Sequence, residues 1–195
     1  MNTEGTRKAI TSYRIDATRS RFFVRASATG MLSAFGHNPT IAIRDFSGEA
    51  QAMPDTLEGA QIRIRINAAA FKVADDINEH DRLEIEKVMN EQVLEITEFP
   101  QITYESNAIA STRIFEGQYR INMSGKLFLH GVTRDFPVEA QLTVSEDSIR
   151  ARGEFTVLLT DFRIRTPRVA GGAISLKNEV KSSFDIVAGR KAAEQ

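Results

Sequence analysis

The 195-residue sequence contains no cysteine and no tryptophan. Without cysteine the chain cannot form disulfides, zinc ribbons, iron–sulfur clusters or a thiol nucleophile. Long apolar runs are also absent: the longest, Ala68 to Phe71, has four residues, whereas a membrane-spanning helix needs about 20. The basic residues near the start are not followed by the apolar stretch of a secretory signal. We therefore expect a cytoplasmic protein with no transmembrane segment.

An excess of charge of either sign is missing as well. The chain has 25 Lys and Arg against 26 Asp and Glu, so the formal net charge is 25 − 26 = −1. Binding to nucleic acid by phosphate neutralisation needs a basic excess, as does polybasic binding to a membrane surface. Both classes of function are disfavoured. The hydrophobic content of 42% is ordinary for a globular domain.

Apolar and polar residues alternate with a period of two through most of the chain, which is typical of half-buried strands. In residues 61–67 every isoleucine falls on one face and both arginines on the other. About eight or nine such runs, separated by turn sequences such as Glu116-Gly117, predict an antiparallel sandwich or barrel. The apolar residues expected to face inward are Phe22, Val24, Ile41, Ile43, Ile62, Ile64, Ile66, Tyr104, Tyr119, Ile121, Met123, Val138, Leu142, Phe155 and Phe184.

Residues 75–96 break this alternation and predict one amphipathic helix. Asp76 or Asn78 is expected to cap its N-terminus. The apolar stripe of this helix consists of Ile85, Val88, Met89 and Gln92. A closed barrel of about eight strands has an interior that holds either side chains or one small ligand. Because the inward set is almost wholly aliphatic and aromatic, any occupant should be apolar.

No established catalytic motif is present. His80 has Asp76 and Glu84 at i−4 and i+4, a spacing that suits a metal ion, although a solvated, charged helix face is the favoured interpretation. His37 and His130 lie in expected turns or at the barrel rim. We expect no metal, no cofactor and no catalytic residue.

Two further features near residue 161 have competing interpretations. Asp161 could act as a general base in an apolar stretch, but a turn-capping or arginine-paired carboxylate is favoured. Arg163, Arg165 and Arg168 form a local basic patch that could hold an anionic head group at the barrel mouth, or simply belong to a solvated loop.

Short motifs follow one another from residue 13 to residue 188: YRID at 13–16, SRFFV at 20–24, DFSG at 45–48, EHDRL at 79–83, FPQITYES at 99–106, GKLFLHGVT at 125–133, DFRI at 161–164 and VKSSFDI at 180–186. Their order and spacing resemble those of the YceI-like family of lipid- and polyisoprenoid-binding proteins. The loop Gly36-His37-Asn38-Pro39 differs from the commoner family sequence.

This resemblance implies a lipocalin-like, eight-stranded antiparallel barrel with one inserted helix, in a single domain over residues 13–188. Residues 1–12 are then a flexible N-terminal segment and residues 189–195 a C-terminal tail. It also implies an elongated apolar pore for a long isoprenoid chain, such as a polyprenyl lipid or an isoprenoid quinone. Family members are often homodimers, and many are periplasmic. The resemblance carries no fixed catalytic set.

Three hypotheses follow. The first is a non-enzymatic binder of an apolar isoprenoid-type ligand, with the inward residues lining the pore and His37, Arg163 and Arg165 at the head-group rim. The second is a small isomerase or hydrolase that uses Asp161 or His80 on an apolar substrate. The third is an interaction or stress-related module whose barrel is filled by its own side chains.

Overall fold

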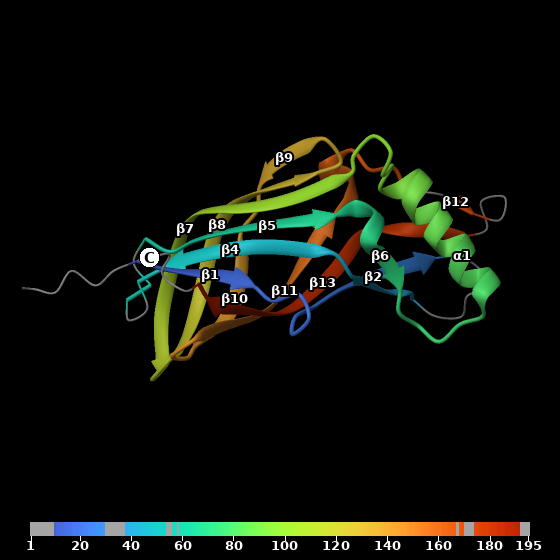
Figure 1. The fold of residues 1–195 in the computed structure, drawn as a ribbon. Helices are drawn as coiled ribbons and strands as arrows, with labels where there is room; N and C mark the ends of the chain where they lie inside the picture. The colour runs from blue at the N-terminus through green and yellow to red at the C-terminus, as the bar shows by residue number, and fades with distance from the viewer. Residues whose placement is uncertain are drawn as a thin grey trace, which may run out of the picture.

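The computed structural model describes residues 10–29, 38–53, 56–57, 59–166, 168–169 and 174–191. Within these residues thirteen strands form one continuous sheet (Figure 1). The strands are β1 (Thr11–Ile15), β2 (Arg21–Thr29), β3 (Thr40–Ile43), β4 (Phe46–Ala52), β5 (Gln61–Asn67), β6 (Phe71–Val73), β7 (Gln101–Phe115), β8 (Gln118–Leu129), β9 (Val132–Asp135), β10 (Val138–Val144), β11 (Ser148–Leu158), β12 (Arg168–Val169) and β13 (Ile174–Arg190).

The sheet closes on itself. Its strands are neighbours in the order β1-β4-β5-β7-β8-β10-β11-β13, and β13 pairs back with β1, where Arg190 lies opposite Tyr13. Neighbouring strands are antiparallel. In the described part of the chain this makes a closed, eight-strand antiparallel barrel with mainly β structure, which confirms the predicted fold class.

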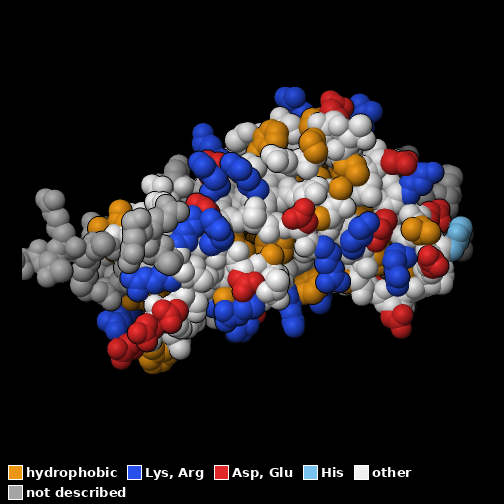
Figure 2. Space-filling model, in the orientation of Figure 1, with side chains coloured by type: hydrophobic (Ala, Val, Ile, Leu, Met, Phe, Trp, Pro, Cys, Tyr) orange, Lys and Arg blue, Asp and Glu red, His pale blue; other side chains and the backbone are white. Residues whose placement is uncertain are grey.

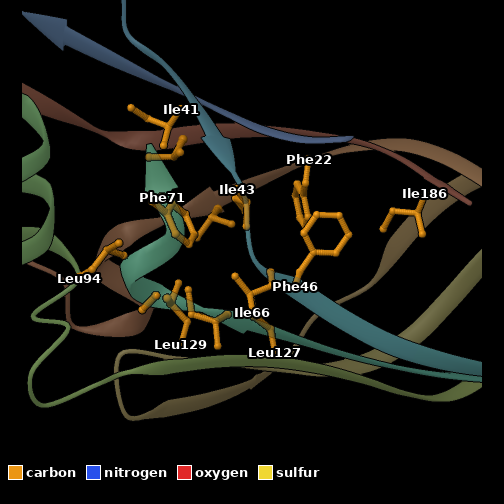
Figure 3. Packing of buried hydrophobic residues seen from close by; sticks show 14 of the residues in the cluster. Phe22, Ile41, Ile43, Phe46, Ile66, Phe71, Leu94, Leu127, Leu129 and Ile186 are labelled. Atoms are coloured by element: carbon orange, nitrogen blue, oxygen red, sulfur yellow. The ribbon is translucent and has the colours of Figure 1, made fainter. Parts of the chain in front are cut away.

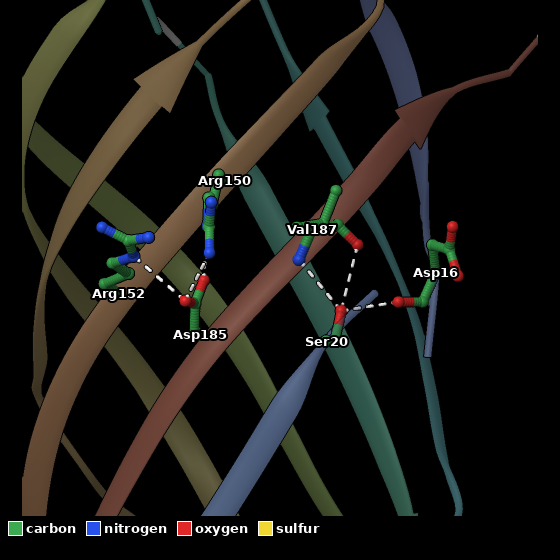
Figure 4. A network of polar contacts seen from close by, with 6 residues as sticks. All are labelled: Asp16, Ser20, Arg150, Arg152, Asp185 and Val187. Atoms are coloured by element: carbon green, nitrogen blue, oxygen red, sulfur yellow. Dashed lines mark hydrogen bonds and ion pairs between the residues drawn. The ribbon is translucent and has the colours of Figure 1, made fainter. Parts of the chain in front are cut away.

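Three strands of this ring, β1, β4 and β5, are each continued at one end of the barrel by a separate strand. β2 follows β1 along the same edge of β13, β3 precedes β4, and β6 follows β5 after the short 3-10 helix η1 (Ala68–Ala70). The break between β1 and β2 is built from side chains. Asp16 Oδ1 accepts a hydrogen bond from the Thr18 amide at 3.0 Å. Ser20 Oγ donates to the Asp16 carbonyl at 2.6 Å and accepts from the Val187 amide at 2.9 Å, which ties the break to β13 (Figure 4).

The predicted helix is present as α1 (Glu79–Val88), which continues into a π-helical turn, η2 (Met89–Val93). Asn78 caps it, because its side-chain oxygen accepts from the Asp81 amide at 2.9 Å. α1 lies across the end of the barrel formed by β2 and β6 (Figure 1). The predicted apolar stripe is wrong at Gln92, which is exposed. The Leu94 amide bonds to the Met89 carbonyl, five residues back, and this wider turn brings Val93 inward instead.

Inward side chains of all the long strands converge on the barrel axis, as alternation requires. Figure 3 shows Phe22, Ile43 and Phe46 pointing toward one another from different strands. Lys, Arg, Asp and Glu side chains are interspersed over the outer face seen in Figure 2. On the outer wall Arg150 binds Asp185 through two nitrogens at 2.6 and 2.7 Å, and Arg152 Nε adds a third bond at 3.1 Å (Figure 4). A further 3-10 helix, η3 (Leu159–Phe162), follows β11.

Candidate ligand-binding cavity

The barrel contains an apolar cavity of about 340 Å³. Pockets for small organic ligands have volumes of about 300–1,000 Å³, so this space is of ligand size. Its wall is made by inward side chains of the barrel strands, which alternate with outward charged residues, and one end is covered by α1 and η2.

The structure places the residues predicted to face the pore around this cavity, with the exception of Tyr119. Those that line it are Phe22, Val24, Ile41, Ile43, Ile62, Ile64, Ile66, Tyr104, Ile121, Met123, Val138, Leu142, Phe155 and Phe184. Their contact with a ligand stays a prediction.

Tyr119 is buried, with 7% of its surface exposed, but it does not line the cavity. It is the second residue of β8, next to the hairpin turn at Gly117, and therefore lies at the extreme end of the barrel. There it packs in a separate apolar cluster with Leu57 and Ala60, which do reach the cavity. Alternation predicted the face on which Tyr119 lies but not whether its side chain reaches the cavity, which its cross-strand neighbour Leu142 does.

Sequence reasoning missed several lining residues. Some share the predicted alternating faces, and the same pattern identifies them: Tyr13, Leu127, Leu129, Val157 and Ile186. Others belong to the helical segment: Ile85, Val88, Met89, Val93 and Leu94. The periodicity of the helix identified an apolar face but carried no information that this face would close the barrel.

Polar contacts add to the apolar packing that holds the helical cover on the barrel. No residue of α1 is fully buried. Glu86 accepts a hydrogen bond from Lys72 Nζ at 2.9 Å with one carboxylate oxygen and from the Val73 amide at 3.1 Å with the other. Because this carboxylate is 12% exposed, it is partly shielded from solvent. One carboxylate therefore joins the middle of α1 to β6.

A second tie holds the chain just after η2. His130 Nε2 lies 2.6 Å from Glu95 Oε2. The imidazole ring also packs on Phe99, with 4.3 Å between ring centroids. His130 occupies the β8–β9 turn with a positive φ of 51°, so it is a turn residue as the sequence predicted. The pair connects the chain after η2 to the adjacent β8–β9 turn.

Polar groups are few inside the cavity. The Tyr104 hydroxyl donates to the Phe136 carbonyl at 3.3 Å, and burial raises the pKa of Tyr104 to about 12. This phenol is therefore neutral at physiological pH. Ser182 is also buried in the lining. Of the described lining residues, Glu84 at the helical end is the one that carries a charge. The wall can pack against hydrocarbon but has little to offer a charged group.

Phenylalanine rings shape the middle of the cavity. The ring of Phe22 lies 6.0 Å from that of Phe155 and 6.2 Å from that of Phe184, and Phe155 lies 5.5 Å from Phe136. Gly153 makes room for this group, because a Cβ at that position would lie 2.6 Å from Cζ of Phe184. These rings form one aromatic part of the cavity wall.

The predicted rim residues are not in the lining. Arg163 and Arg165 are exposed on either side of Ile164, which does line the cavity. They therefore lie one residue from the wall and face outward. His37 lies outside the described residues. A role of these three residues in binding a head group stays a prediction.

The alternative catalytic and metal sites gain no support. In the described ranges no group of three or more His, Asp or Glu side chains is arranged to hold a metal ion, and His80 is exposed on α1. Asp161 is exposed too, and its backbone carbonyl accepts from Arg134 Nε at 3.0 Å. No helix among these residues has both the length and the apolar character to cross a membrane.

Comparison with known proteins agrees with the observed architecture. The family model of the YceI-like domain matches residues 13–188. No curated protein matches the sequence. The crystal structure of BcnA from Burkholderia cenocepacia is similar, with a TM-score of 0.69, 18% identity, and coverage of 89% of this chain and 98% of BcnA.

Two further solved structures share the fold. One is a polyisoprenoid-binding domain from Saccharophagus degradans implicated in plant cell wall breakdown, with a TM-score of 0.68, 14% identity, and coverage of 93% of this chain and 99% of that domain. The other is the YceI protein of Campylobacter jejuni, with a TM-score of 0.60, 16% identity, and coverage of 80% and 87%. At these identities the likeness shows the fold alone.

Proposed function

Since the chain belongs to the YceI-like family, we propose that it binds a long apolar ligand in the barrel cavity and carries it without chemical change. The ligand class is a polyisoprenoid lipid or an isoprenoid quinone. The observation that carries this proposal is the cavity itself, about 340 Å³ lined almost wholly by hydrocarbon side chains beneath a helical cover. A barrel filled by its own side chains would leave no such space.

The apolar wall of the cavity supports a binding mode in which the hydrocarbon tail of the ligand determines its affinity. Each methylene transferred from water into a dry apolar site is worth about 0.8 kcal/mol. The described lining offers few hydrogen-bonding side chains, those of Gln51, Gln61, Glu84, Tyr104 and Ser182, so the tail supplies most of the binding energy. The similar domain from Saccharophagus degradans is described as polyisoprenoid-binding, which agrees with this ligand class.

The head group is proposed to stay at the rim. A charged group inside the cavity would lose its hydration without gaining a cationic partner, because the described lining contains no Lys or Arg. Arg163 and Arg165 flank Ile164 on the outside, and together with His37 they are the proposed contacts for a polar or anionic head group.

The test is a titration of ligand-free protein with a series of polyprenols of increasing length. Solvent extraction under denaturing conditions followed by refolding provides the starting material. The proposal predicts that affinity rises steeply with each added isoprene unit until the cavity is full and then levels off. A length-independent affinity, or no binding by any member of the series, would contradict it.

A further inference from the structure

One buried hydroxyl in the cavity wall has no hydrogen-bond partner among the described residues. Ser182 lines the cavity and is 5% exposed. The other buried serines of the described chain use their hydroxyls to bind main-chain groups. Ser20 Oγ donates to the Asp16 carbonyl, whereas Ser106 Oγ accepts from the Ile62 amide at 2.9 Å. In the part of the chain that the structure describes, no group pairs with the Ser182 hydroxyl, which therefore faces the open space of the cavity.

The surroundings of Ser182 are apolar. It is the middle residue of β13, between the inward side chains of Val180 and Phe184. In the neighbouring strands, Phe155 and Val24 lie directly opposite it. All four of these side chains line the cavity. The hydroxyl of Ser182 thus projects from a hydrocarbon wall about halfway along its strand.

Other polar side chains of the described lining have partners or contact solvent. The exposed ones are Gln51, Gln61 and Glu84. The hydroxyl of Tyr104 donates to the Phe136 carbonyl at 3.3 Å, so its proton is already engaged. Ser182 differs from these residues because its donor is both buried and unpaired.

A resident water molecule is a poor partner for this hydroxyl. An ordered water inside a protein makes two to four hydrogen bonds to polar groups, and the side chains around Ser182 offer none. A long apolar occupant would also displace such a water. Because a buried donor without a partner costs free energy, an occupant that provides an acceptor next to Ser182 gains affinity over one that does not.

The ligand class proposed above has one kind of acceptor to offer at this depth. With the head group at the rim, the part of the ligand that reaches Ser182 is its tail. A saturated hydrocarbon tail contains no hydrogen-bond acceptor. Each isoprene unit of an unsaturated tail contains a carbon–carbon double bond, whose π electrons accept a weak hydrogen bond, as the π electrons of aromatic rings do.

On the basis of the proposed function, we propose that the Ser182 hydroxyl donates a hydrogen bond to a double bond of the bound tail and so selects unsaturated isoprenoid chains over saturated chains of the same length. Ser182 is then a specificity-determining residue of the cavity. A saturated chain fills the same space but leaves the hydroxyl of Ser182 buried and unpaired.

Calorimetric titration with a polyprenol and with the fully hydrogenated alcohol of the same length tests this selection. The measured quantity is the ratio of the two Kd values, hydrogenated over unsaturated. Ser182→Ala removes the donor, which weakens binding of the unsaturated tail and relieves the penalty on the saturated one. The ratio should therefore fall about fivefold from its wild-type value. Differences between the two alcohols in water cancel, because the same pair is titrated into both proteins.

Two further variants separate the hydroxyl from a structural effect. Ser182→Thr keeps a hydroxyl at the same position and should retain the wild-type ratio. Ser183→Ala is the matched control, because Ser183 is the next residue of β13 and does not line the cavity. This control should also show the wild-type ratio. Thermal unfolding of each variant checks that the barrel is intact.

A second measurement needs no variant. Hydrogenated alcohols that keep one double bond, placed in successive isoprene units, are titrated into wild type, and one placement should bind more tightly than the others. An unchanged ratio in Ser182→Ala, an equal fall in Ser183→Ala, or equal affinity for every placement would each overturn the selection by Ser182. In those cases length-dependent binding of the polyprenols still supports the proposed function, whereas failure of all the alcohols to bind overturns both proposals.

Discussion

Narrowing the cavity at Ile64 should weaken ligand binding without unfolding the barrel. Ile64 lies in the middle of β5, faces the cavity and is only partly buried against neighbouring side chains. A tryptophan at this position therefore extends into open space. The perturbation Ile64→Trp tests whether this space is where the ligand lies.

The expected loss of binding free energy follows from the cavity volume that the larger side chain fills. The tryptophan side chain has six more non-hydrogen atoms than isoleucine, and at about 0.8 kcal/mol per excluded methylene the largest possible loss is about 5 kcal/mol. A flexible tail recovers part of this by shifting along the barrel. We expect a loss of at least about 1.4 kcal/mol, which is a tenfold rise in Kd.

Calorimetric titration of ligand-free protein with one long polyprenol measures this rise in Kd. Arg65→Trp is the control, because it adds a tryptophan to the same strand on the outer, exposed face. Thermal unfolding of both variants checks that the barrel is intact. A folded Ile64→Trp variant with wild-type affinity would refute the assignment of the cavity wall at this position.

Three other changes have defined outcomes. Glu86→Gln removes the charged tie between α1 and β6, and ligand dissociation followed by stopped flow should accelerate about fivefold as the cover opens more often. The hydrogen bond from Arg150 is the main cause of the lowered pKa of Asp185, so this carboxylate contributes about 1 kcal/mol to stability above pH 4. The contribution is lost as the pH falls through the lowered native pKa. Asp185→Asn should therefore lose less stability than wild type on acidification. Gly153→Ala should reduce the free energy of unfolding by about 1–3 kcal/mol, because the added Cβ would lie 2.5 Å from a backbone oxygen.

Each of these changes has its own control. Glu91→Gln removes an exposed carboxylate of η2 and should leave ligand dissociation unchanged. The free energies of unfolding of Asp185→Asn and wild type are compared at pH 7 and pH 3. An equal loss of stability in both proteins between these pH values would show that Asp185 does not contribute to the acid sensitivity. Gly189→Ala has nothing within 4 Å of its added Cβ, and a loss equal to that of Gly153→Ala would show that packing is not the cause.

The sequence was most informative in segments where apolar and polar residues alternate with a single regular period. The alternation in β5 and β8 predicted both the strands and their inward residues, because a half-buried strand must place apolar side chains on one face. The cap at Asn78 was predictable for a similar local reason, since its side chain satisfies a free backbone amide at the start of α1. Both features depend on interactions between residues close in the chain.

Features that depend on distant residues were not accessible. The π-helical turn that exchanges Gln92 for Val93 leaves no mark in a 3.6-residue pattern. The packing of Tyr119 in a cluster with Leu57 and Ala60 depends on where the chain before β5 folds back over the barrel. Whether an apolar barrel interior is filled or open depends on the total volume of the inward side chains of all the strands. No single segment of the sequence carries that information.

Native mass spectrometry of the purified protein, followed by solvent extraction and lipid analysis, shows whether the cavity holds a long apolar molecule. We expect a protein mass increased by one ligand and an extract containing an isoprenoid chain in near-equimolar amount. A protein that is bare when isolated and that also takes up no added polyprenol or quinone would contradict it.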